Sequence, residues 1–347
     1  MALTLTSLSD LAALGFDEII DVRSPSEFAE DHVPGAINLP VLDDAERAEV
    51  GTIYKQVSAF TARKIGAALV ARNAAQHLQG PLADRDGGWR PLVYCWRGGQ
   101  RSGSFASILS QVGWRVELIA GGYKAYRKLV VEALYDTPVA APVVVLDGNT
   151  GTAKTEVLAL LAARGVQVID LEGLANHRGS LFGGRAGGQP SQKAFEGRLA
   201  QALGALDPTR VVVVEAESSK VGDRALPPHL WRAMCAAPRI RIAAPLEARA
   251  AYLARAYADL TSDAAELAAV IGRLRHLYAA EVIEGWLKLA AEGEFEPLAH
   301  DLMQRHYDPR YAKQRERTAE DAGRVVETAD LGPAALEGVA DRIAGML

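Results

Sequence analysis

Short apolar runs alternate with longer helical patterns along the first 136 residues. The runs are rich in Ile, Val, Leu and Tyr and occupy residues 17–23, 36–40, 91–94 and 115–119. Between two of them, Ile65, Leu69 and Leu78 recur among alanines at roughly helical spacing, and the stretch after Ser102 also has a helical pattern. Strands that alternate with helices predict a parallel sheet covered on both faces.

The same pattern restarts after a break at residues 137–142, where two prolines and no helical periodicity indicate a linker. Further strands are predicted at residues 142–146, 166–170 and 210–215, and Ala and Leu dominate from 246 to about 303. The chain is therefore predicted to be α/β. It has a first parallel-sheet domain (1–136), a second α/β domain (143–245) and a mainly helical C-terminal region (246–347).

Composition narrows the class of protein without naming a function. The 347 residues suffice for two cores, and 49% apolar with 23% charged residues argues against long disorder. No apolar run reaches the roughly 18–20 residues of a membrane span, and no signal-peptide pattern opens the chain. Cys95 and Cys235 lack metal-type spacing, so we expect a free thiol, no metal site and a cytoplasmic location. A net charge of −5 predicts no general attraction to nucleic acid but allows a local basic face.

The first chemical signal is a cysteine that ends a predicted strand and precedes a Gly-Gly loop and a helix. Glycine amides of such a loop form an anion-binding nest, and the helix N-terminus adds positive potential. Both favour a thiolate, or an anionic persulfide or selenopersulfide, over a thiol. The expected catalytic residues are Cys95, Arg97 and Arg101, with Gly98, Gly99 and Ser102 supporting the bound anion.

The spacing of Cys95 and Arg101 fits two chemistries. It matches the signature of cysteine phosphatases, whose loop grips a phosphate dianion. Sulfurtransferases of the rhodanese group usually have a loop one residue shorter, so the longer loop predicts a larger electrophile, either phosphate-sized or selenium-containing. Cys235 has no such surroundings and is interpreted as structural.

The residues before this loop favour sulfur-type transfer. Residues 21–28 (DVRSPSEF) and 32–40 (HVPGAINLP) resemble the paired signatures of rhodanese domains, and residues 121–123 (GGY) resemble the glycine turn that closes them. The resemblance covers roughly residues 5–135. Asp21 and Arg23 are interpreted as a structural ion pair that braces the sheet edge.

A phosphate-binding loop opens the second domain. Residues 146–155 (LDGNTGTAKT) follow an apolar strand and precede a helical pattern, which is the context of a Walker A loop. The expected diphosphate-binding residues are Gly148, Thr150, Gly151, Lys154 and Thr155, with Thr155 a candidate Mg²⁺ ligand and no other cofactor predicted. Ala153 departs from the pattern, which has glycine there, and puts ordinary nucleotide hydrolysis in doubt.

Other polar residues are candidates for the second site. Residues 210–215 resemble a Walker B strand that ends at Glu215, for which a buried strand with a solvated acidic exit is an equal alternative. Ser218, His177 and Arg178 are expected to line the mouth of the site, where a flexible glycine-rich loop is the alternative.

A rhodanese-like domain joined to a P-loop domain resembles the bacterial tRNA 2-selenouridine synthase family across nearly the whole chain. The resemblance implies a transferase that converts wobble 2-thiouridine in tRNA to 2-selenouridine through an S-geranyl intermediate. The implied substrates are geranyl diphosphate and selenophosphate, and the implied partners are tRNA and a selenophosphate supplier. The rival functions are a cysteine phosphatase or sulfurtransferase joined to a P-loop kinase or ATPase.

A basic and aromatic stretch near the C-terminus is a candidate tRNA-binding face, with a solvated charged helix or loop as the alternative. Arg249 and Arg255 are expected to extend it. The residues of this face are Arg305, His306, Tyr307, Arg310, Tyr311 and Arg315.

Overall fold

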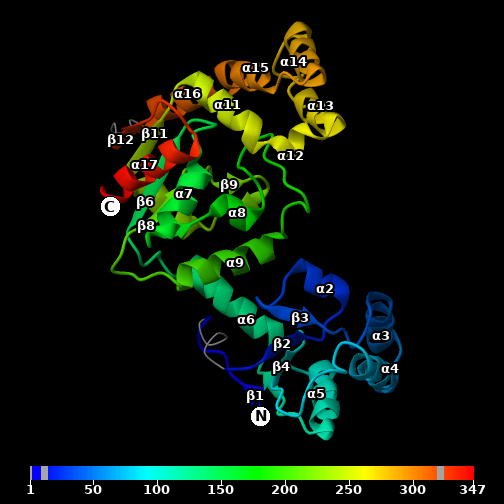
Figure 1. Cartoon of the computed structure of the whole chain (residues 1–347). Helices are drawn as coiled ribbons and strands as arrows, with labels where there is room; N and C mark the ends of the chain where they lie inside the picture. Colours follow the sequence, from blue (N-terminus) through cyan, green and yellow to red (C-terminus); the bar gives the residue numbers. More distant parts are fainter. Residues whose placement is uncertain (1, 9–14, 319–323) are drawn as a thin grey trace. The chain divides into compact units, whose positions relative to one another are not determined.

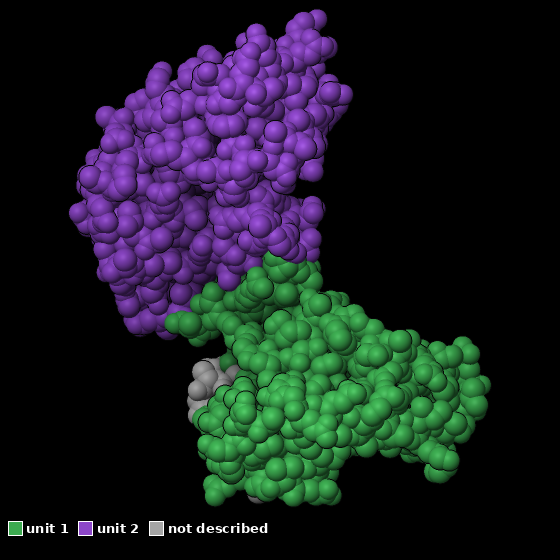
Figure 2. Space-filling model, turned by 45° about the vertical axis from the view of Figure 1, so that its right-hand side comes forward, with its two compact units in different colours: residues 1–138, 190–205 green, residues 139–189, 206–347 purple. Residues whose placement is uncertain are grey.

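The structure, a computed structural model, describes residues 2–8, 15–318 and 324–347, and of residues 314–318 only the backbone. The chain divides into two compact units, which Figure 2 colours separately. Unit 1 comprises Met1–Pro138 and Pro190–Ala205, and unit 2 comprises Val139–Gln189 and Leu206–Leu347. Residues 143–245 are predicted from the sequence to form one domain, whereas this division places Pro190–Ala205 with the first unit.

Unit 1 is built on a five-stranded sheet in the order β1-β5-β4-β2-β3, with every pairing parallel. Four of its strands lie within the four predicted runs, and β1 was not predicted. The bounds are β1 Ala2–Leu3, β2 Glu18–Asp21, β3 Ala36–Asn38, β4 Pro91–Tyr94 and β5 Glu117–Ile119. Because β4 is central, its carboxyl end delivers Cys95 to the middle of the sheet edge (Figure 1).

The helices of unit 1 follow the strands and cover the sheet. Their bounds are α2 Pro25–Glu30, α3 Asp44–Gln56, α4 Ala59–Gln79, α5 Gln100–Val112, α6 Gly122–Val131, a π-helical turn Glu132–Asp136 and α9 Gln192–Gly204. Helix α9 is far away in sequence but is held to this unit by polar contacts. Arg127 and the Tyr135 hydroxyl both donate to Glu196, the latter at 2.7 Å, and Lys193 pairs with Glu30 at 2.6 Å.

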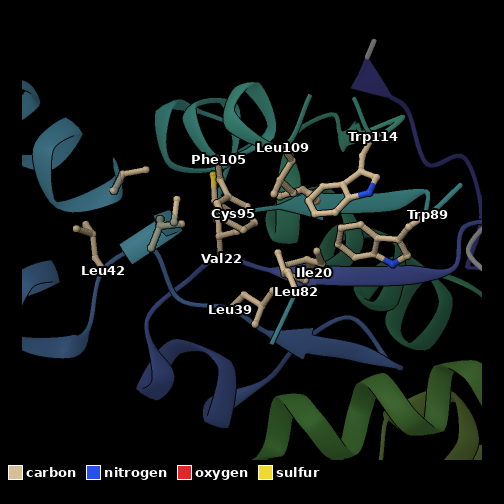
Figure 3. Close-up of a cluster of buried hydrophobic side chains, with 14 residues drawn as sticks. Ile20, Val22, Leu39, Leu42, Leu82, Trp89, Cys95, Phe105, Leu109 and Trp114 are labelled. Atoms are coloured by element: carbon tan, nitrogen blue, oxygen red, sulfur yellow. The ribbon is translucent and has the colours of Figure 1, made fainter. Parts of the chain in front are cut away.

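The core of unit 1 reaches up to Cys95. Figure 3 shows Cys95, with its sulfur in yellow, in one buried cluster with Phe105 and Val22 that includes Leu109 and the tryptophans. Trp89 and Trp114 meet edge to face with ring centroids 5.0 Å apart. The predicted ion pair is confirmed, since Arg23 Nη2 lies 2.6 Å from Asp21 Oδ2 and both side chains are buried.

Unit 2 contains a second parallel five-stranded sheet, in the order β12-β11-β6-β8-β7. The bounds are β6 Val143–Gly148, β7 Gln167–Ile169, β8 Val212–Glu215, β11 Arg239–Ala243 and β12 Arg324–Glu327. The strands β6, β7 and β8 were predicted, while β11 and β12 were not. Because β12 completes this sheet, the C-terminal region shares the core of the P-loop fold. There α17 (Pro333–Ala344) packs on α7 (Lys154–Ala163) through Leu336, Val339 and Leu161.

The remaining helices of unit 2 include a group with its own apolar cluster around Trp286, Leu298 and Leu302. A short antiparallel hairpin, β9 Lys220–Val221 with β10 Arg224–Ala225, follows β8. The bounds are α8 Leu171–Ala175, α10 Pro228–Ala236, α11 Leu246–Ala256, α12 Ala258–Thr261, α13 Ala264–Gly272, α14 Ala280–Glu292, α15 Phe295–Leu302, a π-helical turn Met303–Tyr307 and α16 Asp308–Thr318. None of the helices in the described ranges is both long and apolar enough to cross a membrane.

Candidate functional site

The sulfur of Cys95 lies at the carboxyl end of β4, in a ring of hydrogen-bond donors. The Ser102 hydroxyl donates to Sγ at 3.1 Å and the Gly99 amide at 3.3 Å. Helix α5 begins at Gln100, directly after this amide, and directs its N-terminus toward the sulfur. The loop therefore has the anion-binding form that the sequence predicts.

Hydrogen-bond donors affect the pKa of the Cys95 thiol more than its burial does. Burial of Cys95 alone raises the pKa, because an apolar environment disfavours the thiolate. Hydrogen bonds from Ser102 and from the amides of Arg97 and Gly99 nevertheless hold the pKa of Cys95 below its ordinary value. The thiolate is the nucleophilic form, so the arrangement suits nucleophilic chemistry.

The two arginines of this loop are placed differently from each other. Arg97 is exposed at the loop surface. Arg101 pairs with Glu27 of α2, with Nη1 2.7 Å from Oε2, and Arg47 of α3 approaches the same carboxylate at 3.9 Å. In this structure, Arg101 therefore braces α5 against α2, and the hydrogen bonds to Cys95 come from Ser102 and backbone amides.

A glycine turn fixes the loop from the other side. The Tyr123 amide donates to the Cys95 carbonyl at 2.8 Å. Gly122 has φ +59°, and a Cβ there would collide with that carbonyl and lie 2.6 Å from the Gly98 nitrogen. Gly98 itself has φ +67°. The resemblance of residues 121–123 to a closing turn thus has a steric basis, since only glycine lets the two backbones approach.

The phosphate loop of unit 2 has the predicted strand, loop and helix in register. It connects β6 to α7, and Lys154 Nζ donates to the Gly148 carbonyl at 2.9 Å. Burial alone would lower the pKa of Lys154, but the potential of Tyr311, Glu172 and Glu217 holds it above its ordinary value. A lysine kept charged at a helix N-terminus fits an anion such as a diphosphate.

Ala153 keeps the backbone conformation of the glycine that it replaces. Its φ is +57° and its ψ is +31°, in the left-handed region that alanine disfavours by roughly 1–2 kcal/mol. Its methyl group is buried among Leu146, Val157 and Ile240, and burial of a methyl contributes about 0.8 kcal/mol. Part of the strain is therefore offset by packing.

A cavity of about 540 Å³ opens over this loop. Thr150, Gly151, Lys154 and Thr155 line it, whereas the lining residues do not include Gly148. Gly148 serves the loop sterically, because a Cβ there would collide with the Thr152 hydroxyl. Ser218 and Arg178 also line the cavity, as predicted, and Arg178 pairs with Asp259 at 2.8 Å. His177 accepts from the Gly179 amide at 3.1 Å and does not line the cavity.

Three glutamates stand beside the phosphate loop, and only one of them was among the predicted site residues. Glu215 is fully buried, and its Oε1 accepts from the Glu172 amide at 2.7 Å. Glu172 in turn accepts from the Thr155 hydroxyl at 2.8 Å and lines the cavity together with Glu217. Glu215 therefore positions Glu172. The sequence signal for Glu217 was its place two residues after Glu215, at the end of a predicted strand.

The carboxyl groups of Glu172 and Glu217 are neighbours at the edge of the phosphate loop, and both line the cavity. Burial raises the pKa of Glu217 to about 8, the neighbouring Glu172 adds to the rise, and Lys154 opposes it. Glu217 therefore holds a proton at neutral pH beside the phosphate loop.

The C-terminal helices close the phosphate loop rather than form an open basic face. Arg249 is buried and not part of a surface patch. It donates to the Thr150 carbonyl at 3.2 Å and to Asp308 at 2.8 Å. Asn149 also donates to Asp308, at 2.9 Å. These bonds join the loop to α11 and α16.

The structure places the expected tRNA-binding residues in different environments. Among the expected tRNA-binding residues whose side chains are described, Arg305 alone does not line the cavity. It is largely exposed and pairs with Asp301 at 2.8 Å. His306 is 3% exposed, so the expectation of an open stacking face is wrong for this ring. Burial and the nearby Arg310 lower the pKa of His306 to about 4. Four of the residues line the phosphate cavity: His306, Tyr307, Arg310 and Tyr311. Arg315 lies in α16, and its side chain is outside the described part.

An apolar cleft adjoins the phosphate cavity. The two share Thr150, Ser180, Leu253, Tyr257 and Tyr307 in their walls. The cleft continues between α11 and α15, along side chains that are almost all apolar: Phe182, Leu260, Leu267, Phe295, Leu298, Leu302 and Met303. A ligand with an anionic head and a hydrocarbon tail matches a phosphate cavity that is followed by an apolar cleft.

Comparison with known proteins agrees with this architecture. Residues 4–129 match the family model of the rhodanese-like domain, and residues 141–273 match that of the tRNA 2-selenouridine synthase AAA domain. A tRNA 2-selenouridine synthase of Hahella chejuensis is 34% identical over 87% of this chain and 86% of its own length. One of Pseudomonas syringae pv. syringae is 34% identical over 90% and 92%, and one of Chromohalobacter salexigens 40% over 74% and 70%.

Proposed function

The chain belongs to the tRNA 2-selenouridine synthase family, and we propose that its two loops divide one conversion of a tRNA base between them. The phosphate loop binds geranyl diphosphate and directs S-geranylation of wobble 2-thiouridine. The Cys95 loop then directs replacement of the geranylated sulfur by selenium from selenophosphate. The observation that carries the proposal is the apolar cleft that continues from the phosphate cavity.

In the first step, the base sulfur attacks C1 of the geranyl group. A sulfur–carbon bond forms, the carbon–oxygen bond to the diphosphate breaks, and the diphosphate leaves with its electron pair, while the N3 proton of the base passes to solvent. Lys154 and the N-terminus of α7 stabilise the negative charge that develops on the leaving group. The cleft, with a volume of about 70 Å³, takes up part of the hydrocarbon chain, and the C1 end lies in the adjoining phosphate cavity beside the charged loop.

Mg²⁺ is compatible with the residues around the diphosphate. Thr155 and Glu172 offer a hydroxyl and a carboxylate oxygen within 2.8 Å of each other, the hard donors that this ion prefers. When bound, the ion would neutralise diphosphate charge. The described residues contain no cluster of three or more His, Cys, Asp or Glu side chains fit to hold a metal, so substrate oxygens would have to complete the coordination.

In the second step, the Cys95 thiolate attacks the phosphorus of selenophosphate. A sulfur–phosphorus bond forms, the phosphorus–selenium bond breaks, and selenium leaves as the hydrogen selenide anion. The donors that hold the Cys95 thiolate, Ser102 and the Gly99 amide, stabilise the anionic nucleophile. The selenide then attacks C2 of the geranylated base, the selenium–carbon bond forms, the carbon–sulfur bond breaks, and geranylthiol leaves, with the selenide proton passing to N3 and a solvent proton to the thiol. Water hydrolyses the phosphocysteine, which releases phosphate and restores Cys95.

Mass spectrometry of tRNA nucleosides separates the two steps. With both donors present, we expect Cys95→Ala to accumulate S-geranyl-2-thiouridine and form no 2-selenouridine. We expect Lys154→Ala to form neither product from thiolated tRNA, but to convert tRNA that is already geranylated. Lys220→Ala, which removes an exposed lysine of the same unit, is the control. Loss of geranylation in Cys95→Ala would overturn the two-site division.

The rival in which the P-loop hydrolyses ATP is tested in parallel. Release of inorganic phosphate from ATP by the wild type, abolished in Lys154→Ala, would replace the prenyl-transfer proposal for this loop. Under the proposal, geranyl diphosphate protects the protein against thermal unfolding and ATP does not.

A further inference from the structure

An exposed aromatic and basic tip lies on unit 1, at the turn between α3 and α4. In the part of the chain that the structure describes, nine large hydrophobic residues are exposed, and three of them fall within seven positions. They are Tyr54, Val57 and Phe60, with exposed fractions of 59%, 72% and 71%. Such a concentration on a surface indicates a contact with another molecule.

The tip is held rigidly. Helices α3 and α4 lie side by side (Figure 1) and are joined by Val57 and Ser58 alone. The Ser58 hydroxyl caps α4 by accepting from the Thr61 amide at 3.3 Å, and the Ser58 amide donates to the Ile53 carbonyl at 3.0 Å. A tip built this way presents its rings without a large ordering cost on binding.

The charge around the tip selects the class of partner. The chain has a net charge of −5, yet no Asp or Glu occurs between Glu49 and Asp84. Within that stretch, Lys55, Arg63 and Lys64 are exposed and lie within four positions of Tyr54 or Phe60 in the chain. Basic side chains interleaved with exposed rings match single-stranded RNA, whose phosphates need cations and whose unpaired bases stack on aromatic faces.

The tip also stands within reach of the cysteine loop. Arg47 of α3 and Arg101 of the loop helix contact the same Glu27 carboxylate. Tyr54 lies seven residues beyond Arg47 on the same helix, which is about 10 Å along the axis at 1.5 Å per residue.

We propose that the α3–α4 tip binds unpaired nucleotides of the tRNA substrate by stacking on Tyr54 and Phe60, with Lys55 and Lys64 on the phosphates. The inference rests on the proposed use of tRNA as substrate. It assigns an RNA contact to the cysteine-bearing unit, separate from the C-terminal residues around the phosphate cavity.

Fluorescence anisotropy with thiolated tRNA tests the proposal. We expect Tyr54→Ala with Phe60→Ala to weaken binding by roughly 5- to 150-fold per ring, since base stacking on an aromatic ring contributes about 1–3 kcal/mol. Tyr54→Leu with Phe60→Leu should bind as weakly, because leucine keeps an apolar surface without a ring. Val112→Ala, an exposed apolar residue of the same unit, should bind like the wild type. Lys55→Gln with Lys64→Gln should lower the slope of log affinity against log salt concentration by the amount expected for about two phosphate contacts.

Other outcomes would overturn it. Wild-type affinity in the double alanine variant would remove the tip from RNA binding. Restored affinity in the leucine variant would replace stacking by general apolar contact. Conversion of a wild-type dimer to a monomer with unchanged tRNA affinity would make the tip an interface between copies. If the wild type binds tRNA but yields no 2-selenouridine, the proposed function fails while this binding test still stands.

Discussion

The hydroxyl of Ser102 lies 3.1 Å from the sulfur of Cys95 and is buried with it. This hydrogen bond joins the first turn of α5 to the end of β4 and helps hold the pKa of the Cys95 thiol below its ordinary value. The nucleophilic state of the cysteine thus depends on a residue seven positions away in sequence, beyond the Gly-Gly turn.

Removal of this donor should raise the pKa of Cys95. We expect Ser102→Ala to shift it upward, because the variant loses a hydrogen bond that favours the thiolate over the thiol. The pH dependence of alkylation measures the shift, in a Cys235→Ser background because Cys235 is exposed. Ser107→Ala on the same helix is the control, and an unchanged midpoint in Ser102→Ala would contradict the role of the hydroxyl.

Two glycine substitutions in unit 1 should have opposite effects on stability. Gly122→Ala places a methyl against the Cys95 carbonyl at φ +59° and should cost about 3 kcal/mol or more. Gly103→Ala, within α5 and with open space around its Cβ, should stabilise by about 0.5–1 kcal/mol. Calorimetric unfolding of both variants measures the effects. Equal stability of the two variants would contradict the prediction, because it would show that the turn at Gly122 can move away from the Cys95 carbonyl.

The left-handed alanine of the phosphate loop should tolerate glycine but not a branched side chain. Ala153→Gly relieves roughly 1–2 kcal/mol of strain but loses a buried methyl and gains unfolded-state entropy, about 0.8 and 0.4–1 kcal/mol, so we expect a net change within about 1 kcal/mol. Ala153→Val should cost more than about 2 kcal/mol, because a β-branched residue at φ +57° is a genuine outlier. Denaturant unfolding distinguishes the two, and a stable valine variant would refute the strain argument.

The raised pKa of Glu217 predicts a pH dependence with a defined sign. Because its pKa rises from 4.5 to about 8, the folded state binds the proton more tightly than the unfolded state. Stability should therefore fall as pH rises through this window, and Glu217→Gln should fall less. Ionisation near pH 8 should also weaken diphosphate binding in the wild type. Calorimetry at pH 5 to 9 measures both trends, with Glu284→Gln, an exposed residue, as control. Parallel slopes in the wild type and Glu217→Gln would contradict the assignment.

Much of the local structure could be predicted from the chain. The runs that became β2, β4, β6 and β8 were visible because buried parallel strands are short, apolar and followed by loops. The loops after β4 and β6 were visible for the same reason, since glycines, a cysteine or a lysine come directly after each strand. The strands β11 and β12 escaped, because short runs with exposed or charged positions resemble segments of a helix or loop.

The two strand–loop–helix units and the chemistry of their loops follow from the order of residues, because a backbone nest depends on residues adjacent in the chain. Which side chains complete the loops depends on contacts between distant parts of the chain. Arg101 meets Glu27 across 74 positions, and Arg249 meets Asp308 across 59. Glu172 and Glu217 come together because β7 and β8 are neighbours in the sheet. Such pairs depend on strand order and helix packing, which follow from burial of the whole chain.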